Sequence, residues 1–485
     1  SSCRTYVRLG ARCSFTDCCK IIIESEGTKM KIITPKNLSG FMELPPKEQV
    51  LFEKIRQKLE ETYRLFGFYP IDTPVLERSE ILLAKTGGDT GKQIYRFSKG
   101  DTDMAMRFDL TVPLAKYVAK NYSELTFPFK RYQIGKVYRG ERAQQGRFRE
   151  FYQADIDIIG DGDLSVVNDA EVPSIMYQVF TGLGLQDFTI RLNNRKVLNG
   201  LFEMFGLSES ATDVMRVIDK LDKIGEESVK AELEEMNISA DVTDELLGLL
   251  TFQGSNAEII EKLKAFAGRS EMLDLGVQEL SEVVYYMDKF GVPQENYRVD
   301  LTIARGLDYY TGTVYETTFN RHPEIGSICS GGRYDNLAEF FTKKKLPGVG
   351  MSIGLTRLFY ILNEFDYLNR TLATSADVLV IPMTEDMASA VEISAKLREK
   401  GISTQIYFEK KKFKHKIAYA DKLSIPYAIF LGEDELKENK VTLKKMFAAE
   451  DDENKQCTVS LEEAEAVIAD GLKALHQGAC IRITD

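Results

Sequence analysis

Hydrophobic and polar residues alternate with a period of two in three segments between residues 104 and 160. This period predicts β-strands with one apolar and one polar face. The polar faces would carry Arg107, Asp109 and Thr111 in Met106–Val112, Arg131, Gln133 and Arg139 in Arg131–Arg139, and Gln153, Asp155 and Asp157 in Phe151–Ile159. A sheet with one face in water explains any single strand of this kind. Together, the three mixed polar faces favour the floor of a binding site, because short side chains on rigid strands position a polar ligand well.

A spacing of three to four residues between apolar positions predicts helices elsewhere in the chain. Pro46–Leu65 has this spacing, and Gly67 follows it as a stop signal. Residues 207–291 are rich in Glu, Lys, Leu and Met and show long helical periodicities. We therefore expect a helical insertion there, between two strand-like regions.

After residue 375 the pattern changes to short apolar runs that alternate with helical sequence. Val378–Pro382, Thr404–Phe408 and Tyr427–Leu431 are typical of strands, and Ala388–Lys400 is typical of a helix that ends at Gly401. This order of strand, helix and strand predicts a small α/β domain with a partly parallel sheet. The length of 485 residues is itself typical of about three domains.

Composition changes this picture in one respect. The net charge of −11 argues at first sight against a nucleic-acid partner, because phosphate binding requires Lys and Arg. Residues 130–149, however, contain seven basic residues and one acidic residue. This segment is either a solvated basic hairpin or an anion site, since Arg side chains match phosphate oxygens. No apolar run approaches the roughly 18 residues of a membrane span, so we expect no membrane partner.

Residues 1–29 differ from the rest of the chain. They hold four of the seven cysteines, precede the first methionine, Met30, and lack the apolar stretch of a secretory signal. We interpret this segment as a leader or a non-native sequence that is disordered and takes no part in the fold. The other cysteines, Cys329, Cys457 and Cys480, are scattered without a CxxC motif. We therefore expect neither disulfides nor a zinc site, and a cytoplasmic location.

Three glycine-containing strings complete the set of candidate site segments. In Ala304–Gly312 and Ser330–Asp335 the glycines allow the backbone to approach a ligand, although each string alone is also a plausible turn. Gly348–Arg357 runs from a small-residue strand into an apolar helix, with Arg357 near its first turn. A cation there opposes the helix dipole, which favours a compensating ligand. The chain has no P-loop and no GxGxxG motif, so ATP, if used, is bound in another way.

These strings together resemble the histidyl-tRNA synthetase family. The resemblance rests on Met106–Pro113, Tyr138–Arg142, Arg147–Gln153, Ala304–Thr311 and Ser330–Asp335. Gly348–Arg357 is similar to class II motif 3, and Pro74 stands where motif 1 has its proline. The similarity runs from about Met30 to the C-terminus. It implies an α+β fold with an antiparallel-sheet class II catalytic core at residues 30–206 and 292–368, a helical insertion at 207–291 and an anticodon-binding α/β domain at 376–485.

The resemblance also implies a reaction and a set of site residues. The family activates L-histidine with ATP, in the presence of Mg2+, to histidyl-adenylate and transfers it to the 3′ end of tRNA(His), as a homodimer. Arg139 and Arg305 match the two catalytic arginines at the α-phosphate, and Arg305 also matches the residue that contacts the histidine carboxylate. The other matches are Glu141, Arg142 and Arg357 for ATP, Asp109 and Thr111 for the α-amino group, Gln153 toward the carboxylate, and Asp157, Tyr309 and Tyr310 for the histidine side. One departure is Thr356, where motif 3 commonly has an acid.

Two further segments are candidates for tRNA contact. Gln144 and Gln145 lie in the loop between the second and third predicted strands. Lys410, Lys411, Lys412 and Phe413 belong to a lysine run in the C-terminal domain. Such a run is most often a solvated face. An aromatic residue among cations nevertheless fits the recognition of unpaired bases.

Two non-catalytic alternatives remain at this point. Relatives of the synthetase core serve as regulatory subunits of ATP phosphoribosyltransferase, but these typically lack the C-terminal domain and lose the Arg305–Tyr310 string, and both are intact here. The chain would otherwise be a sensor of histidine or uncharged tRNA without turnover. Arg139, Arg305 and Arg357 argue against a sensor, because all three would serve the reaction.

Overall fold

The structure, a computed structural model, describes residues 33–84, 88–142, 146–303, 310–385, 387–449, 452, 454–476 and 478–482. The segment interpreted as a leader, residues 1–29, lies outside the described residues. The chain divides into two compact units, Ser1–Leu38 and Ser39–Asp485. All helices and strands described below belong to the second unit.

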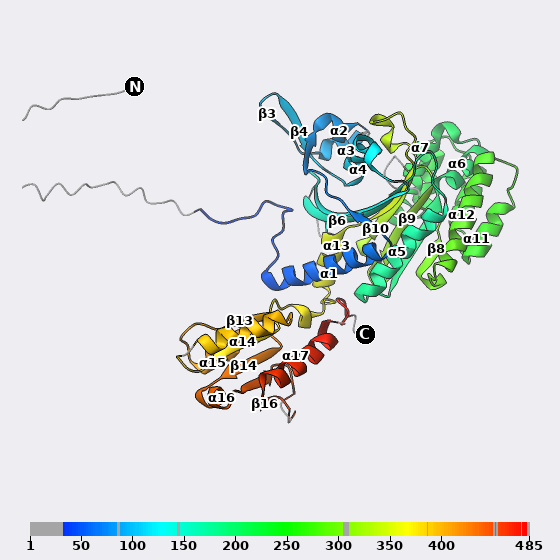
Figure 1. Cartoon of the computed structure of the whole chain (residues 1–485). Helices are drawn as coiled ribbons and strands as arrows, with labels where there is room; N and C mark the ends of the chain where they lie inside the picture. Colours follow the sequence, from blue (N-terminus) through cyan, green and yellow to red (C-terminus); the bar gives the residue numbers. More distant parts are fainter. Residues whose placement is uncertain are drawn as a thin grey trace, which may run out of the picture. The chain divides into compact units, whose positions relative to one another are not determined.

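An eight-stranded sheet is the largest of the sheets described in this unit (Figure 1). Its strand order is β1-β5-β6-β11-β10-β9-β7-β8, and it is antiparallel except where β1 pairs with β5 and β7 pairs with β8. The strands are β1 Tyr69–Pro70, β5 Phe129–Tyr138, β6 Glu150–Ile159, β7 Phe188–Asn194, β8 Tyr297–Val299, β9 Thr313–Phe319, β10 Ser327–Tyr334 and β11 Gly348–Ile353. The expected antiparallel-sheet core is confirmed. The turn alternative for Ser330–Asp335 is wrong, because most of this string lies inside β10.

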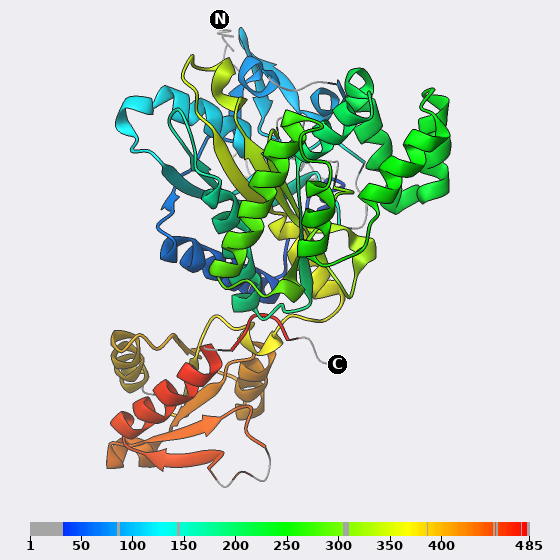
Figure 2. The same cartoon turned by 90° about the vertical axis from the view of Figure 1, so that its right-hand side faces the viewer.

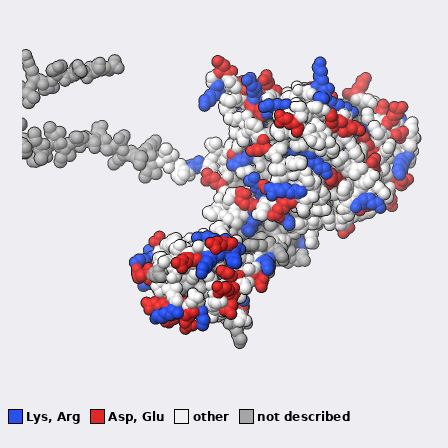
Figure 3. Space-filling model, in the orientation of Figure 1, with Lys and Arg blue, Asp and Glu red and all other residues white. Residues whose placement is uncertain are grey.

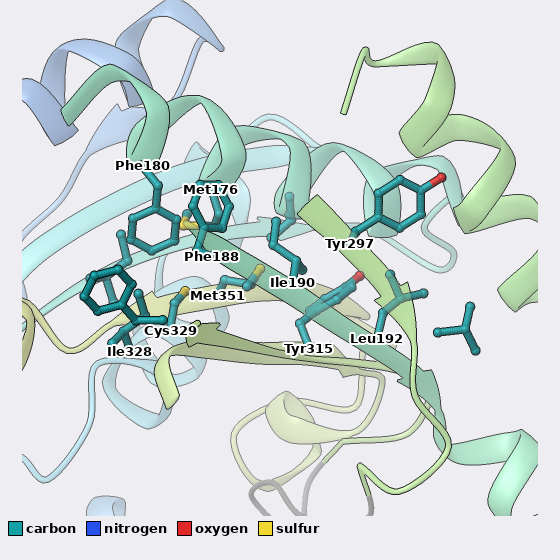
Figure 4. Close-up of a cluster of buried hydrophobic side chains, with 14 of the residues drawn as sticks. Met176, Phe180, Phe188, Ile190, Leu192, Tyr297, Tyr315, Ile328, Cys329 and Met351 are labelled. Atoms are coloured by element: carbon teal, nitrogen blue, oxygen red, sulfur yellow. The ribbon is translucent and has the colours of Figure 1, made fainter. Parts of the chain in front are cut away.

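Helices cover one face of the sheet and leave the other face to polar side chains. The covering helices are α1 Pro46–Leu65, α5 Val167–Leu183 and α13 Leu355–Glu364. Alternation along β6 points Tyr152, Ala154 and Ile156 into this core. Figure 4 shows Met176 and Phe180 of α5 above Phe188 and Ile190 of β7. The helix predicted over Pro46–Leu65 is confirmed at both ends.

A small second sheet and three helices precede β5. The sheet has the order β2-β4-β3, with β2 Leu76–Arg78, β3 Arg96–Lys99 and β4 Thr102–Met106, and the helices are α2 Ser79–Leu83, α3 Gly88–Gln93 and α4 Thr111–Lys120. The strand predicted over Met106–Val112 is wrong beyond Met106. Asp109 Oδ1 accepts a hydrogen bond from the backbone amide of Val112 at 3.2 Å, and Pro113 stands in the first helical turn, where its missing amide is tolerated.

All elements described between residues 207 and 291 are helical (Figure 2). After α6 Arg195–Met204 they are α7 Ala211–Ile218, α8 Leu221–Ile224, α9 Glu226–Glu235, α10 Ala240–Leu250, α11 Asn256–Lys264 and α12 Glu271–Lys289. Ser239, Ser255 and Ser270 each accept a first-turn amide and so define where α10, α11 and α12 begin. Within the described ranges, none of the helices is both long and apolar enough to cross a membrane.

The C-terminal part contains a five-stranded sheet with the order β13-β12-β14-β15-β16. Pairs of β12 with β13 and β14 are parallel, and those involving β15 are antiparallel, as the partly parallel prediction requires. The elements are β12 Val378–Pro382, α14 Ala388–Glu399, β13 Thr404–Ile406, α15 Phe413–Lys422, β14 Tyr427–Leu431, α16 Glu433–Glu438, β15 Val441–Lys445, β16 Gln456–Val459 and α17 Leu461–His476. Short 3-10 helices at Tyr122–Glu124, Ser208–Ser210, Gln294–Asn296, Pro323–Ile325, Leu337–Phe340 and Arg370–Leu372 complete the described elements.

Candidate active site

The polar face of the eight-stranded sheet is organised in two rows of residues that run across the strands. Strand register aligns one row, here called the Asp157 row, as Arg131, Asp157, Gly350, Gly332, Val314 and Asn193. A second row lies two residues away from the first in each strand and is here called the Asp155 row. It contains Gln133, Asp155, Ser352, Ser330, Glu316 and Arg191. Because side chains two residues apart share a face, both rows face the same side.

A cavity of about 480 Å³ lies over this face. Seven of the predicted site residues line it, namely Asp109, Thr111, Arg139, Glu141, Gln153, Tyr310 and Arg357. Arg142 is exposed and does not belong to the cavity wall. Four predicted residues, Gln144, Gln145, Arg305 and Tyr309, lie outside the described residues. The chain thus brings together residues of α4, β6, α13 and the segment after β5 that are far apart in sequence.

Arg139 is held in the cavity wall by two contacts. Its Nε donates to the carbonyl oxygen of Phe108 at 3.1 Å, and its guanidinium carbon lies 5.1 Å from the centre of the Phe151 ring. A guanidinium group carries five N–H donors, so these contacts leave donors for an anion in the cavity. The planar group is therefore oriented before any ligand arrives.

Arg357 lies in the first turn of α13, as predicted. Its Nη2 donates to the carbonyl oxygen of Ile325. This hydrogen bond holds the Arg357 side chain in the wall of the cavity. The neighbouring Thr356 is buried and accepts a hydrogen bond from the backbone amide of Tyr152 at 2.8 Å. This hydroxyl therefore joins α13 to β6 at the position where motif 3 commonly has an acid.

Asp157 does not line the cavity, although its row lies on the same side of the sheet. Its Oδ2 is 2.5 Å from Nη2 of Arg131, and its Oδ1 accepts from the Tyr334 hydroxyl at 2.6 Å. Burial raises the pKa of Asp157, while Arg131 and Tyr334 act in the opposite direction. Tyr334 and Arg131 were not predicted as site residues, although both belong to segments that the sequence singled out.

Tyr310 depends on a glycine of the Asp157 row. A Cβ atom at Gly332 would lie 2.8 Å from Cδ1 of the Tyr310 ring, closer than real side chains approach. Gly332 therefore leaves the space that Tyr310 occupies. The adjacent Arg333 has a structural role: it is buried and forms an ion pair with Asp169 at 2.6 Å, and Thr313 donates to the same carboxylate at 2.7 Å.

Asp109 and Asp155 are buried carboxyls in the cavity wall. Burial raises the pKa of Asp109 to about 6 and that of Asp155 to about 7. Arg131 opposes this effect at both residues, and the neighbouring carboxyl of Asp157 reinforces it. Asp155 shares its strand face with Gln153 and Asp157, so the period-two pattern already predicted that it lies on the polar face of the sheet.

The basic segment 130–149 is only partly an anion site. Lys130 and Lys136 form ion pairs with Glu171 and Glu150, at 2.7 and 2.8 Å. Arg139 faces the cavity instead, with Arg147 also in the wall. Acids outside the segment therefore neutralise part of the excess charge, which the local count of residues could not reveal.

The lysine run of the C-terminal domain is also heterogeneous. Lys410, Lys411 and Lys412 are exposed, and Lys410 pairs with Glu385 at 2.7 Å. Phe413 is 45% exposed and begins α15. Lys416, by contrast, is buried and donates to the carbonyl oxygen of Pro382 at 2.7 Å. Basic and acidic side chains are interspersed on the face of this domain that Figure 3 shows.

No group of three or more His, Cys, Asp or Glu side chains in the described parts of the chain is arranged to hold a metal ion. Cys329 is buried in the main core, and Cys457 and Cys480 are half-buried free thiols.

Comparisons with known proteins agree over both parts of the chain. Residues 40–358 match the family described as histidyl-tRNA synthetase, and residues 377–470 match the anticodon binding domain. The chain is 54% identical over 441 residues to a histidine–tRNA ligase of Clostridium tetani, covering 91% of this chain and 99% of the relative. It is 43% identical over 476 residues to a histidine–tRNA ligase of Xanthomonas campestris pv. campestris, covering 91% and 100%.

Solved structures that resemble this chain include a histidyl-tRNA synthetase. The crystal structure of histidyl-tRNA synthetase from Nostoc sp. PCC 7120 has a TM-score of 0.83 and 39% identity, and the match covers 90% of this chain and 100% of that one. An ATP phosphoribosyltransferase regulatory subunit/histidyl-tRNA synthetase from Bacillus halodurans C has a TM-score of 0.69 at 22% identity, covering 82% and 99%. The second likeness is evidence for the fold alone.

Proposed function

The chain belongs to the histidyl-tRNA synthetase family, and we propose that the cavity described above is where it activates histidine. As a class II histidine–tRNA ligase, it uses ATP to activate histidine and charges tRNA. The observation that carries the proposal is the convergence of seven predicted site residues on one cavity wall.

Activation requires in-line attack of the histidine carboxylate on the α-phosphate of ATP. The protein therefore has to position two anions and stabilise the charge that develops at phosphorus. Arg139 suits this role, because its guanidinium is oriented by Phe108 and Phe151 and retains donors for an oxyanion. Arg305 is assigned as the second α-phosphate and carboxylate ligand on its sequence match alone.

Histidine is assigned to the part of the cavity beside β6. Asp109 and Thr111 would take the α-amino group, and Gln153 would act near the carboxylate. Asp157 would reach the imidazole from below, where Tyr334 and Arg131 already hold its carboxylate, and Tyr309 and Tyr310 would complete the pocket. A substrate without an imidazole would leave such buried polar groups unpaired, which is costly and supplies specificity.

ATP is assigned to the part of the cavity near motif 3. Arg357 would stack on adenine, with Glu141 and Arg142 orienting the nucleotide. Mg2+ would arrive with the phosphates, since it keeps several waters and needs few protein carboxylates. Glu141 and Glu316 both line the cavity and would be available as such carboxylates. The ion would neutralise phosphate charge during activation.

The tRNA would span both parts of the chain. The segment around Gln144 and Gln145 is proposed to meet its 3′ end, and Lys410, Lys411, Lys412 and Phe413 to meet unpaired bases. The anticodon-binding domain and the exposure of these four residues support this assignment. We further propose a homodimer, formed through motif 1, that works in the cytoplasm.

Aminoacylation of total tRNA with each standard amino acid in turn tests this function against both alternatives. Charging by histidine alone is expected. A regulatory subunit or a sensor without turnover would charge tRNA with none of them. In the same preparation, Arg305→Ala should lower histidine-dependent ATP–pyrophosphate exchange by at least roughly 10²-fold, the cost of one lost oxyanion contact. Exchange near the wild-type rate would remove Arg305 from the mechanism.

A further inference from the structure

The connection between β9 and β10 holds Arg357 through its backbone. Nη2 of Arg357 donates to the carbonyl oxygen of Ile325, and a Cβ atom at Gly326 would lie 3.6 Å from the same nitrogen. Ile325 itself does not line the cavity. Because the acceptor is a backbone carbonyl, the conformation of this connection decides where the Arg357 guanidinium is held.

This conformation is a short 3-10 helix, Pro323–Ile325, which His322 precedes. The amide of Ile325 donates to the carbonyl oxygen of His322 at 3.2 Å, and the amide of Gly326 donates to that of Pro323 at 3.0 Å. Gly326 then takes a φ of 74°, which glycine adopts without strain. These hydrogen bonds make His322 and Ile325 parts of one tight turn, so a displacement of His322 moves the Ile325 carbonyl.

His322 is held by three side chains. Its ring stacks on that of Phe365, with the ring centres 3.6 Å apart and an angle of 19° between the ring planes. Nδ1 lies 3.1 Å from Oε1 of Glu324, and Nε2 lies 3.1 Å from the hydroxyl oxygen of Tyr367. Since an ionised carboxylate can only accept, Nδ1 of the neutral ring donates to Glu324 and Nε2 accepts from Tyr367. Both ring nitrogens are therefore engaged, and the His322 side chain is only 16% exposed.

Two of these three side chains follow the helix that carries Arg357. Phe365 comes directly after α13, and Tyr367 lies two residues further along the chain. The Tyr367 amide donates to the carbonyl oxygen of Leu362 at 2.8 Å, and the Tyr367 carbonyl oxygen accepts from the amide of Arg482 at 2.8 Å. Because Arg357 lies in the first turn of α13, the β9–β10 connection is attached at both ends of this helix.

We propose that His322 is a positioning residue for adenine binding, because it fixes the turn whose Ile325 carbonyl orients Arg357. The inference rests on the proposed function, which assigns Arg357 to adenine. His322 is not a catalytic residue, since its side chain does not line the cavity. Packing of aromatic rings alone would explain the contact with Phe365 but not the hydrogen bonds at both ring nitrogens. These two directional contacts select one orientation of the ring and, through it, of the turn.

Steady-state ATP–pyrophosphate exchange with the full-length chain tests the proposal. His322→Phe retains an aromatic ring against Phe365 and removes both ring nitrogens. It should raise the KM for ATP by about 3- to 30-fold, the range expected for losing a cation–π contact with adenine, and change the KM for histidine by less than about twofold. An unchanged KM for ATP, or an equal rise in both KM values, would overturn the proposal.

A milder pair of variants removes one hydroxyl at a time. Tyr367→Phe deletes the donor to His322 and keeps the ring, so it stays informative if His322→Phe folds poorly. It should raise the KM for ATP by a smaller factor than His322→Phe does. Tyr177→Phe is the matched control, because Tyr177 of α5 also contacts an aromatic ring, that of Phe188 at 6.1 Å, and does not line the cavity. It should leave both KM values unchanged, and equal effects of the two hydroxyl deletions would contradict the proposal.

A double-mutant cycle with Arg357→Gln separates this inference from the proposed function. If His322 acts through Arg357, adding His322→Phe to Arg357→Gln should not raise the KM for ATP further, since the effects of coupled residues do not add. Independent, multiplicative effects would overturn the positioning role and leave the assignment of Arg357 intact. A KM for ATP that Arg357→Gln alone leaves unchanged would instead remove Arg357 from the proposed adenine site, and the inference with it.

Discussion

Gly350 lies opposite Asp157 across the β6–β11 pair, and the Asp157 carboxylate occupies the space where a side chain at position 350 would begin. A Cβ atom at Gly350 would overlap with Oδ1 and lie 2.6 Å from Cγ of Asp157. The carboxylate can therefore bond to Arg131 and Tyr334 only because the facing residue has no side chain.

Gly350→Ala should displace the Asp157 carboxylate and raise the KM for histidine by at least about tenfold, with a much smaller change in the KM for ATP. The reason is that a lost charge-assisted contact costs about 1.5–3 kcal/mol. Steady-state exchange kinetics measure both values. Gly248→Ala serves as the control, since a Cβ atom there would meet nothing within 4 Å in α10. It should leave kinetics unchanged and stabilise the helix by about 0.5–1 kcal/mol.

Stability should depend on pH through Asp109 and Asp155. Their folded-state pKa values of about 6 and about 7 exceed the unfolded value, so the folded state binds more protons between these limits. The free energy of unfolding should then fall as the pH rises from about 4 to about 7 in the absence of substrate. Asp155→Asn should flatten this fall, by about 1.4 kcal/mol for each unit of pKa difference removed. Urea unfolding at several pH values measures the slope, and the exposed Asp101→Asn should leave it unchanged.

Asn193 should position the chain that leads toward Arg305. Its buried Nδ2 donates to the carbonyl oxygens of Leu301 and Ile303, at 3.2 and 3.1 Å. Asn193→Ala leaves both acceptors unsatisfied, which should cost about 1–3 kcal/mol and lower kcat for exchange more than it changes either KM. Asn296→Ala is a matched control, because its Nδ2 also donates to two carbonyl oxygens, those of Gln186 and Phe188. Equal kinetic effects from the two variants would contradict a positioning role.

The exposed lysines should affect tRNA and not activation. Replacing Lys410, Lys411 and Lys412 together by Gln should raise the KM for tRNA and leave ATP–pyrophosphate exchange at the wild-type rate. The slope of log affinity against log salt concentration should fall by about 0.7 for each phosphate contact that is lost. Exposed Lys437, Lys440 and Lys473 of the same domain, replaced in the same way, provide the control. An equal loss from both triple variants would indicate a general charge effect without a defined site.

The sequence predicted well where a repeating pattern corresponds to a local structure. Alternation along β6 placed Gln153, Asp155 and Asp157 on one face, and helical spacing delimited α1. The same alternation failed after Met106, because Asp109 accepts the Val112 amide and starts a helix there. Periodicity describes which face a residue takes, and it contains no information about a local hydrogen bond that ends the strand.

Partners distant in sequence could not be predicted from the pattern. Arg131 is fully buried against Asp157, Lys416 is buried on the Pro382 carbonyl, and Thr356 accepts the Tyr152 amide. Arg, Lys and Thr side chains are mostly exposed in proteins. Their burial here depends on which element packs against them. Asp155 likewise lies on the predicted polar face, but only the structure reveals that its Oδ1 has no donor among the described residues.

Strands β5 and β6 pair over ten residues, from Phe129↔Ile159 to Tyr138↔Glu150. An insertion or deletion in either strand would therefore change which face of the sheet each following side chain takes. Inserting one residue near the start of β6 would turn Ala154, Ile156 and Ile158 toward the cavity and bury Gln153, Asp155 and Asp157 in the core. A point substitution in this strand alters the contacts of one side chain. A change of length by one residue would instead move every polar side chain that follows it into the core and every apolar one to the cavity face. Natural variation in this enzyme should therefore change the identity of residues along β6 while conserving their number.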